Sequence, residues 1–185
     1  SGSLSKYILR KVPYDFEYAD IQAGIGTPHA VYAEFTADET LLVRAEAQAL
    51  LGHYAEALDD LNTELAAFSR EGVQLTLDDV KKFYSDDVTA YYTPEKPTPR
   101  KAFHTTFAIS KDTEEPMLQC ILHLRRIMTI HEGLRMQDVK RYGITIYRRD
   151  VKSNYKITGI TDTMEARDPR LAIQLPQDVI TAGVT

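Results

Sequence analysis

Residues 37–62 read ADETLLVRAEAQALLGHYAEALDDLN, and this stretch decides the fold. Apolar residues recur at helical spacing on both sides of Gly52, which predicts two helices folded back on each other. Gly52 suits the left-handed residue that ends a first helix, and Tyr54 begins the second. Small residues stand where two helix backbones must approach closely, namely at Ala45, Ala49 and Ala57. The stretch therefore predicts a helical hairpin.

The spacing within this hairpin is typical of a tetratricopeptide-type unit. Leucines fill the groove on either side of the small residues: Leu42, Leu50, Leu58, Leu61 and Leu65. One such hairpin cannot bury its apolar face alone, so it needs neighbouring elements. It is a scaffold unit and carries no chemistry by itself.

The composition is that of an ordinary globular chain. At 185 residues, with 43% hydrophobic and 26% charged residues, it is one domain or a large part of one. The net charge of -5 argues against nucleic-acid binding, which needs a basic patch. No apolar run approaches the roughly 20 residues of a membrane-spanning helix. Residues 1–3 are typical of an expression scar, and residues 4–185 are treated as one region.

Helices dominate the rest of the prediction. Residues 36–72 contain the hairpin, and residues 76–79 have the form of a capping box that begins a short helix. A second helical unit is expected over residues 116–143, with a helix that begins after Pro116 and a break at Gly133.

Short strands and loops complete the predicted fold. Residues 144–185 are expected to form short strands and a tail, with residues 144–147 and 155–158 paired as a hairpin. The tail alternates over residues 171–176, and a helical turn can begin at Gln177. The segment before residue 36 is expected to be irregular, with a turn-rich loop over residues 23–28. The fold class is mainly α, with short peripheral strands and long loops.

The sequence shows no catalytic, metal or cofactor site. His123 and His131 lie about 80° apart around a helix, which is a poor spacing for two metal ligands. Neighbouring carboxylates such as Asp59 and Asp60 point about 100° apart, so they form no shared acid–base site. Cys120 is interpreted as a small buried thiol, with a catalytic nucleophile as the minor alternative.

One charged cluster stands out around residues 132–143. Arg135, Asp138 and Arg141 recur at intervals that place them on one helical face, and Glu132 can reach Arg135 across Gly133. The two arginines of this cluster could recognise an anion or a sugar. The favoured interpretation is a partly buried structural network that locks a corner between two helices.

Residues 132–143, EGLRMQDVKRYG, resemble the E-G-x-R-x-x-D-(apolar)-x-R-(aromatic)-G signature of the SusD/RagB-type nutrient-binding proteins of Bacteroidetes. Residues 39–47 and 60–62 are similar to the E-x-L-L-x-R-A-E-A and D-L-N block of the same family. Residues 168–180 are similar to its closing segment. The chain departs from many members at Leu124 and at His131. Since members are several times longer, the resemblance covers their C-terminal part and implies that this chain is such a portion.

The resemblance implies a non-catalytic protein on the outer face of the outer membrane. It would bind oligosaccharides or other nutrients and deliver them to a SusC-like TonB-dependent transporter. A lipid anchor on an N-terminal part absent from this chain would hold it at the membrane, with no cofactor and no nucleic-acid partner. The alternative is a tetratricopeptide-type protein-interaction scaffold without a small-molecule ligand. A glycan-degrading enzyme is a distant third.

No glycan-contact position of that family maps onto a motif in this chain. From the residues alone, Tyr91 and Tyr92 beside a proline-rich loop at residues 93–100 are the candidates for stacking against a sugar ring. The competing interpretation is that both tyrosines pack beneath that loop. The absence of tryptophan further weakens the case for a sugar platform.

Overall fold

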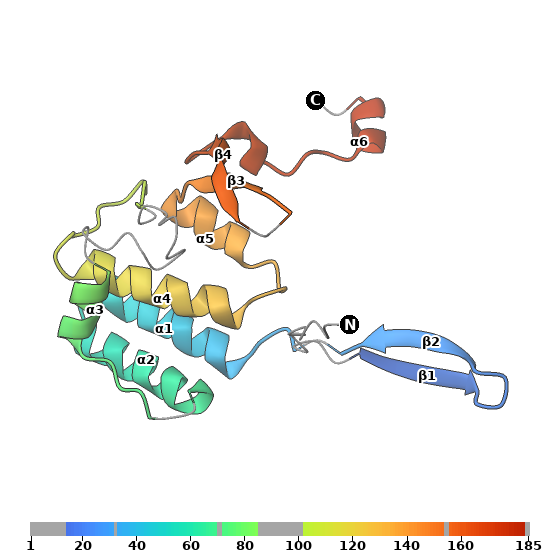
Figure 1. Ribbon diagram of the computed structural model, residues 1–185, viewed down its shortest axis with the longest axis horizontal. Helices are drawn as coiled ribbons and strands as arrows, with labels where there is room; N and C mark the ends of the chain where they lie inside the picture. The colour runs from blue at the N-terminus through green and yellow to red at the C-terminus, as the bar shows by residue number, and fades with distance from the viewer. Residues whose placement is uncertain (1–13, 32, 70–71, 85–101, 154–155, 184–185) are drawn as a thin grey trace. The chain divides into compact units, whose positions relative to one another are not determined.

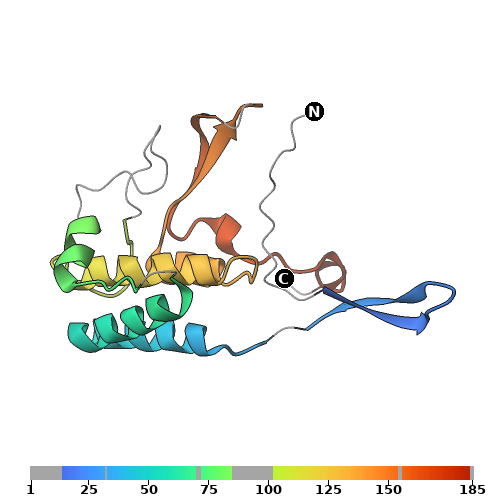
Figure 2. The same ribbon diagram turned by 60° about the horizontal axis from the view of Figure 1, so that its bottom comes forward.

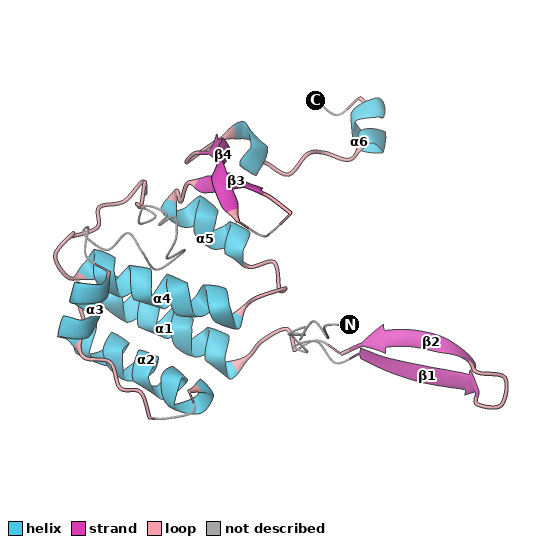
Figure 3. Cartoon of the chain, in the orientation of Figure 1, coloured by secondary structure: helices cyan, strands magenta, loops and turns pink. Residues whose placement is uncertain are grey.

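The structure of the chain is a computed structural model that describes residues 14–31, 33–69, 72–84, 102–153 and 156–183 (Figure 1). Of the described residues, helices account for 46% and strands for 18%, with the strands in two small antiparallel sheets (Figure 3). This confirms a chain in which helices are mixed with short strands. The chain divides into two compact units, Ser1–Ala37 and Asp38–Thr185, and each is described by itself.

The predicted helical hairpin is formed by α1 (Ala37–Leu50) and α2 (Tyr54–Phe68), which lie side by side in the larger unit (Figures 1 and 2). Gly52, in the turn between them, has a φ of +78°, which glycine adopts without the strain of a Cβ atom. The small residues expected at the helix contact are fully buried: Ala45, Ala49 and Ala57.

The short helix α3 (Leu77–Phe83) begins with the predicted capping box. The hydroxyl oxygen of Thr76 accepts a hydrogen bond from the backbone N–H of Asp79 at 3.2 Å. The carboxylate of Asp79 accepts one from the backbone N–H of Thr76 at 3.1 Å. Each side chain thus satisfies a backbone donor that has no partner within the helix.

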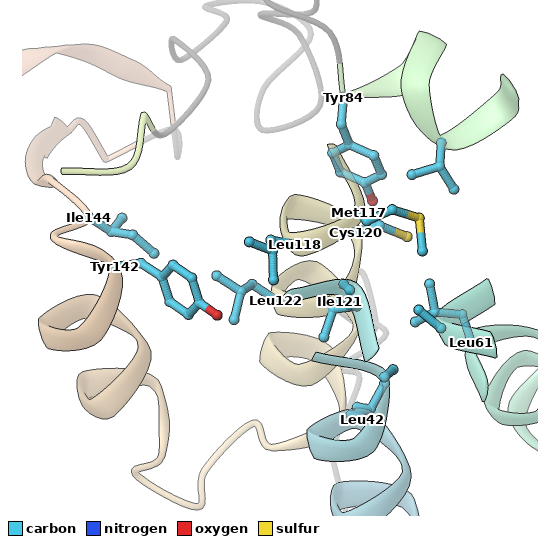
Figure 4. Packing of buried hydrophobic residues seen from close by; sticks show 14 of the residues in the cluster. Leu42, Leu61, Tyr84, Met117, Leu118, Cys120, Ile121, Leu122, Tyr142 and Ile144 are labelled. Atoms are coloured by element: carbon cyan, nitrogen blue, oxygen red, sulfur yellow. The ribbon is translucent and has the colours of Figure 1, made fainter. Parts of the chain in front are cut away.

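The central helix of the core is α4 (Glu114–Met128), which begins slightly earlier than predicted. Pro116 lies within its first turn, where a residue without an N–H is tolerated. Figure 4 shows Leu42 from α1, Leu61 from α2 and Tyr142 from a further helix arranged around α4. The buried residues that α4 contributes to this cluster are Met117, Leu118, Cys120, Ile121 and Leu122.

The helix α5 (Arg135–Tyr142) ends at Gly143, which has a φ of +60°. A Cβ atom on Gly143 would lie 2.4 Å from the backbone carbonyl oxygen of His104. The backbone N–H of His104 donates to the carbonyl oxygen of Tyr142 at 2.8 Å, which fixes that close approach. Both the backbone conformation and the neighbouring segment therefore require glycine at position 143.

The predicted C-terminal hairpin is present, with different bounds. The strands β3 (Ile146–Val151) and β4 (Ile157–Met164) pair antiparallel, with Ile146 opposite Met164. Ile144, expected to open the first strand, is instead buried in the core at 1% exposure. The pairing therefore begins only after the chain leaves the core.

The tail departs from its predicted extended form. Pro169–Leu171 forms a short 3-10 helix, η1, and residues 172–176 are irregular. Leu171 lies in the core and is 8% exposed. The alternation over residues 171–176, which suggested a strand, therefore reflects one buried side chain. The helix α6 (Gln177–Thr181) begins directly after Pro176, as expected.

The smaller unit corrects the prediction of an irregular N-terminal segment. Its strands β1 (Tyr14–Asp20) and β2 (Ile25–Ala30) form an antiparallel hairpin, with Phe16 opposite Pro28. Proline argues against a central strand, but in a two-stranded sheet every strand is an edge, where proline is tolerated. Gly24 and Gly26 were both expected in a loop. Gly24 does lie in the turn, whereas Gly26 lies within β2.

One helical hairpin of the expected type is present, and a repeat of such hairpins is not shown among the residues that the structure describes. The tetratricopeptide-like repeat therefore stays a prediction. So does the treatment of residues 4–185 as a single region of a larger protein.

Candidate functional site

Two buried carboxylates on different helices share one arginine. Arg125 on α4 donates a hydrogen bond from Nη1 to Oδ1 of Asp138 on α5 at 2.8 Å. Its Nη2 donates to Oε2 of Glu46 on α1. The side chains of Arg125, Glu46 and Asp138 are 8%, 10% and 7% exposed. The guanidinium therefore links three helices inside the larger unit.

Two further side chains complete this group, which we name the Glu46 cluster: Glu46, Arg125, Asp138, Arg141 and Tyr142. Arg141 donates from Nε to Oε1 of Glu46 at 3.0 Å, and its side chain is 54% exposed. The Tyr142 hydroxyl donates to the same oxygen at 2.5 Å. Both oxygens of Glu46 thus accept hydrogen bonds, which is what a buried carboxylate requires.

The electrostatics of the cluster favour the charged forms of Glu46 and Arg125 and the neutral form of Tyr142. Burial alone would raise the pKa of Glu46, but the hydrogen bond from Tyr142 and the charge of Arg125 outweigh it and lower that pKa below 4.5. Burial alone would lower the pKa of Arg125, but the carboxylates of Glu46 and Asp138 favour its charged form more strongly. The pKa of Arg125 is therefore raised. Burial and the nearby Glu46 carboxylate raise the pKa of Tyr142. Glu46 is therefore an ionised acceptor and Tyr142 a protonated donor at neutral pH.

A groove of about 320 Å³ lies beside the cluster. Its walls combine aliphatic side chains of α1 with charged and polar side chains of α4 and α5: Val43, Glu46, Ala47, Leu50, Arg125, Gln137, Asp138 and Arg141. Arg141 stands at its exposed side, whereas the carboxylates of Glu46 and Asp138 are engaged by Arg125. The arrangement suits cohesion between helices, because the ionised Glu46 carboxylate is held by hydrogen bonds from Arg125, Arg141 and Tyr142.

The four residues predicted as a structural network are placed as follows. Arg135 and Asp138 do lie together, with Nη1 and Oδ2 3.6 Å apart. Arg141 uses its Nε on Glu46 of α1, rather than on Asp138 as the helical spacing suggested. Glu132 lies exposed in the turn before α5. The network thus extends across the core instead of along one helical face.

Sequence reasoning missed Glu46, Arg125 and Tyr142 as members of the network. A local signal for Glu46 existed, because it stands on the buried stripe of α1 with Leu42, Ala45 and Ala49. Arg125 likewise continues a buried stripe of α4. A charge within an apolar stripe indicates a buried pair, although periodicity does not identify its partner.

Polar contacts also hold together the α1–α2 hairpin, whose first helix contains Glu46. Arg44 donates to both carboxylate oxygens of Asp60, from Nε at 3.0 Å and from Nη2 at 2.5 Å, and so joins α1 to α2. The Asn62 side chain accepts from the backbone N–H of Leu75 at 2.7 Å and donates to its carbonyl oxygen at 3.0 Å. Asn62 thereby holds the segment before α3 against α2.

The remaining candidate residues show no convergent chemistry. Nδ1 of His123 lies 2.8 Å from the Tyr84 hydroxyl, and His131 is exposed with a φ of +68°. Within the described ranges, no group of three or more His, Cys, Asp or Glu residues could hold a metal ion. Burial raises the pKa of the Cys120 thiol to about 12, which disfavours the reactive thiolate. Tyr91 and the adjacent Tyr92 lie outside the described residues.

Comparison of the chain with models of protein families, with curated proteins and with solved structures finds no match. In the part of the chain that the structure describes, no helix combines the length and the apolar character needed to cross a membrane.

Proposed function

We propose that this chain is the scaffold region of a non-catalytic, surface-exposed nutrient-binding protein of the SusD type. In this proposal the whole protein stands on the outer membrane and passes oligosaccharides or other nutrients to a TonB-dependent transporter. The observation that carries the proposal is the Glu46 cluster, because it joins the sequence blocks on which the resemblance rests.

The block at residues 39–47 contributes Glu46 to the cluster. The block at residues 132–143 contributes Asp138, Arg141 and Tyr142. Arg141 and Glu46 are 95 positions apart in the chain, yet their side chains bond at 3.0 Å. The signature glycine, Gly143, is required by its backbone conformation. Motif residues that depend on one another in space support a shared fold more strongly than the same residues matched singly.

The closing segment of the resemblance also has a structural role. Arg170 donates to Asp168 from Nε at 2.9 Å and to Asp162 from Nη1 at 2.5 Å. Its Nη2 donates to the carbonyl oxygen of Thr163 at 2.6 Å. Arg170 thus ties the tail to β4, and the segment supports the scaffold rather than a reaction.

The rival proposal is a protein-interaction scaffold of tetratricopeptide type. It is favoured by the α1–α2 hairpin and by apolar side chains at its surface, such as Val43, Leu51 and Phe68, which are 51%, 69% and 59% exposed. Such a chain would bind another protein and no sugar.

The test is calorimetric titration of the full-length gene product, and of this chain, with a panel of soluble oligosaccharides. We expect saturable binding by the full-length protein and weaker binding by this chain, since single weak contacts add up only when several are preorganised. Alanine variants of Tyr91 and Tyr92 then test the stacking candidates, with exposed Tyr18 as the control. No binding to any oligosaccharide of the panel, together with tight binding to a protein partner, would favour the protein-interaction scaffold. Hydrolysis of a glycan would overturn both proposals.

A further inference from the structure

The groove of about 320 Å³ beside the Glu46 cluster has one aliphatic wall and one polar wall. The aliphatic wall belongs to α1, where Val43, Ala47 and Leu50 recur at helical spacing. Val43 is 51% exposed and Ala47 is exposed too, so a solute can reach this wall. The polar wall includes Gln137 and Arg141 of α5, which stand four positions apart and therefore on one face of that helix. Small-molecule sites combine apolar and polar lining in this way, from about 300 Å³ upwards.

Arg141 is an exposed arginine that the fold nevertheless holds in place. Its Nε donates to Oε1 of Glu46 at 3.0 Å. Its guanidinium carbon lies 5.6 Å from the centroid of the Phe107 ring, which is within the range of a cation–π contact. The Tyr142 hydroxyl and the Glu46 carboxylate raise the pKa of Arg141, so the group stays charged. A side chain that is already held loses less conformational freedom when a ligand binds.

The contacts of Arg141 leave its outer hydrogen-bond donors for a ligand. Within the described ranges, neither Nη1 nor Nη2 of Arg141 donates a hydrogen bond, and the side chain is 54% exposed. Arg44 and Arg170, by contrast, donate from their Nη atoms to other groups of the fold. Gln137 adds an exposed side-chain amide that has no hydrogen-bond partner among the described residues. The planar fork of a guanidinium matches the two oxygens of a carboxylate.

The two acidic residues that line the groove are each compensated by arginine. Glu46 accepts hydrogen bonds from Arg125 and Arg141. Asp138 accepts one from Arg125 at 2.8 Å, and Nη1 of Arg135 lies 3.6 Å from its other oxygen. The side chains of Glu46 and Asp138 are 10% and 7% exposed, against 54% for Arg141. The charge that a solute meets in this groove is therefore mainly that of Arg141, and it attracts an anion.

We propose that this groove binds a small organic acid, with its carboxylate at Arg141 and Gln137 and a short aliphatic body along Val43 and Leu50. The aliphatic wall favours the body, because the contact removes apolar surface of both from water. Inorganic phosphate also matches the guanidinium fork, but it offers nothing to the aliphatic wall. A sugar carries no charge for Arg141, and its hydroxyl groups would lose water against that wall. The site does not depend on the proposed function.

The experiment is a titration of the purified, isotopically labelled chain with isocaproate, followed by NMR chemical shifts, which detect weak binding. We expect saturable shifts at the residues that line the groove. Isocaproamide has the same body without the charge and should bind at least about tenfold more weakly. Inorganic phosphate should also bind more weakly than isocaproate, because it lacks the aliphatic body. Absent saturation, equal affinity for the acid and the amide, or tighter binding of phosphate would overturn the proposal.

Variants of the polar wall test the head group. Arg141→Gln should weaken isocaproate at least about tenfold. The matched control is Arg148→Gln, since Arg148 is exposed and is not among the residues that line the groove. It should bind isocaproate as the parent does. Gln137→Ala leaves the Glu46 cluster intact and should weaken isocaproate about threefold, so it tests the site even if Arg141→Gln does not fold. Circular dichroism establishes that each variant is folded.

A variant of the aliphatic wall tests the body of the ligand. Val43→Ser should weaken isocaproate and leave the affinity for acetate unchanged, because acetate has a carboxylate and almost no aliphatic body. Equal effects of Val43→Ser on the two acids would overturn the assignment of that wall. Equal effects of Arg141→Gln and Arg148→Gln would show that the acid binds through general surface charge, and would overturn the site itself.

Discussion

The carboxylate of Glu46 accepts a hydrogen bond from the guanidinium of Arg125, although the two residues stand 79 positions apart in the chain. Both side chains are at least nine-tenths buried. Such a pair contributes little net stability over an apolar pair, yet the loss of one partner leaves an uncompensated charge. We therefore infer that the cluster acts mainly on specificity, by fixing how α1, α4 and α5 pack together.

Removal of Asp138 tests whether the cluster is structural. Asp138→Ala should lower the free energy of unfolding by about 3–5 kcal/mol, because it leaves the charge of Arg125 only partly compensated in the interior. Urea denaturation measures this change. Asp59→Ala, at an exposed carboxylate of α2, is the control and should change stability little. Unchanged stability together with lost ligand binding would instead assign Asp138 to a recognition surface.

Low pH should destabilise the folded protein, in part because Glu46 becomes protonated. Its folded-state pKa lies below the ordinary value of 4.5, so the unfolded chain binds that proton more readily. The contribution of Glu46 is therefore present above pH 4.5 and is lost as the pH falls through the folded-state pKa. Urea midpoints between about pH 3 and 6 should fall less steeply for Glu46→Gln than for the parent. Parallel curves would show that Glu46 does not carry this dependence.

The buried side of α2 at Ala57 should not tolerate a larger side chain. Ala57 is fully buried, so Ala57→Leu should overpack the core and destabilise the chain by about 1–3 kcal/mol. Ala66→Leu adds the same volume at an exposed position of the same helix and should be nearly neutral. Thermal melts of the two variants make the comparison. A parent-like melt for Ala57→Leu would contradict the packing described here.

Two glycines with positive φ should differ sharply in their tolerance of alanine. Gly133 has a φ of +77° and open space around a Cβ atom, so Gly133→Ala should cost about 1–2 kcal/mol of backbone strain. Gly143→Ala carries a similar strain and also brings a Cβ atom to 2.4 Å from the backbone of His104. It should therefore be clearly the more damaging in urea denaturation. Equal losses would mean that the His104 segment moves aside at little cost.

Local patterns predicted the local structure well. The turn at Gly52 and the capping box of Thr76 each depend on residues close together in the chain. The β1–β2 hairpin was missed because Pro28 suggested a break, whereas an edge strand accepts proline.

The candidate site was predicted only in part. Helical spacing correctly predicted that Arg135 and Asp138 lie close together. It could not show that Arg141 would bond to Glu46 on another helix, because such a pairing is set by how the helices pack and leaves no periodicity in the sequence. The charges of Glu46 and Arg125 within apolar stripes were the available signal, and they identify buried charges without identifying their partners.

The most direct test of the central claim is a double-mutant cycle between Glu46 and Arg125, measured by urea denaturation. The variants are Glu46→Gln, Arg125→Met and the two combined. If the pair joins α1 to α4, the double variant should be less destabilised than the sum of the single variants, with a coupling of about 1–3 kcal/mol. Additive losses would contradict the claim that this contact joins α1 to α4.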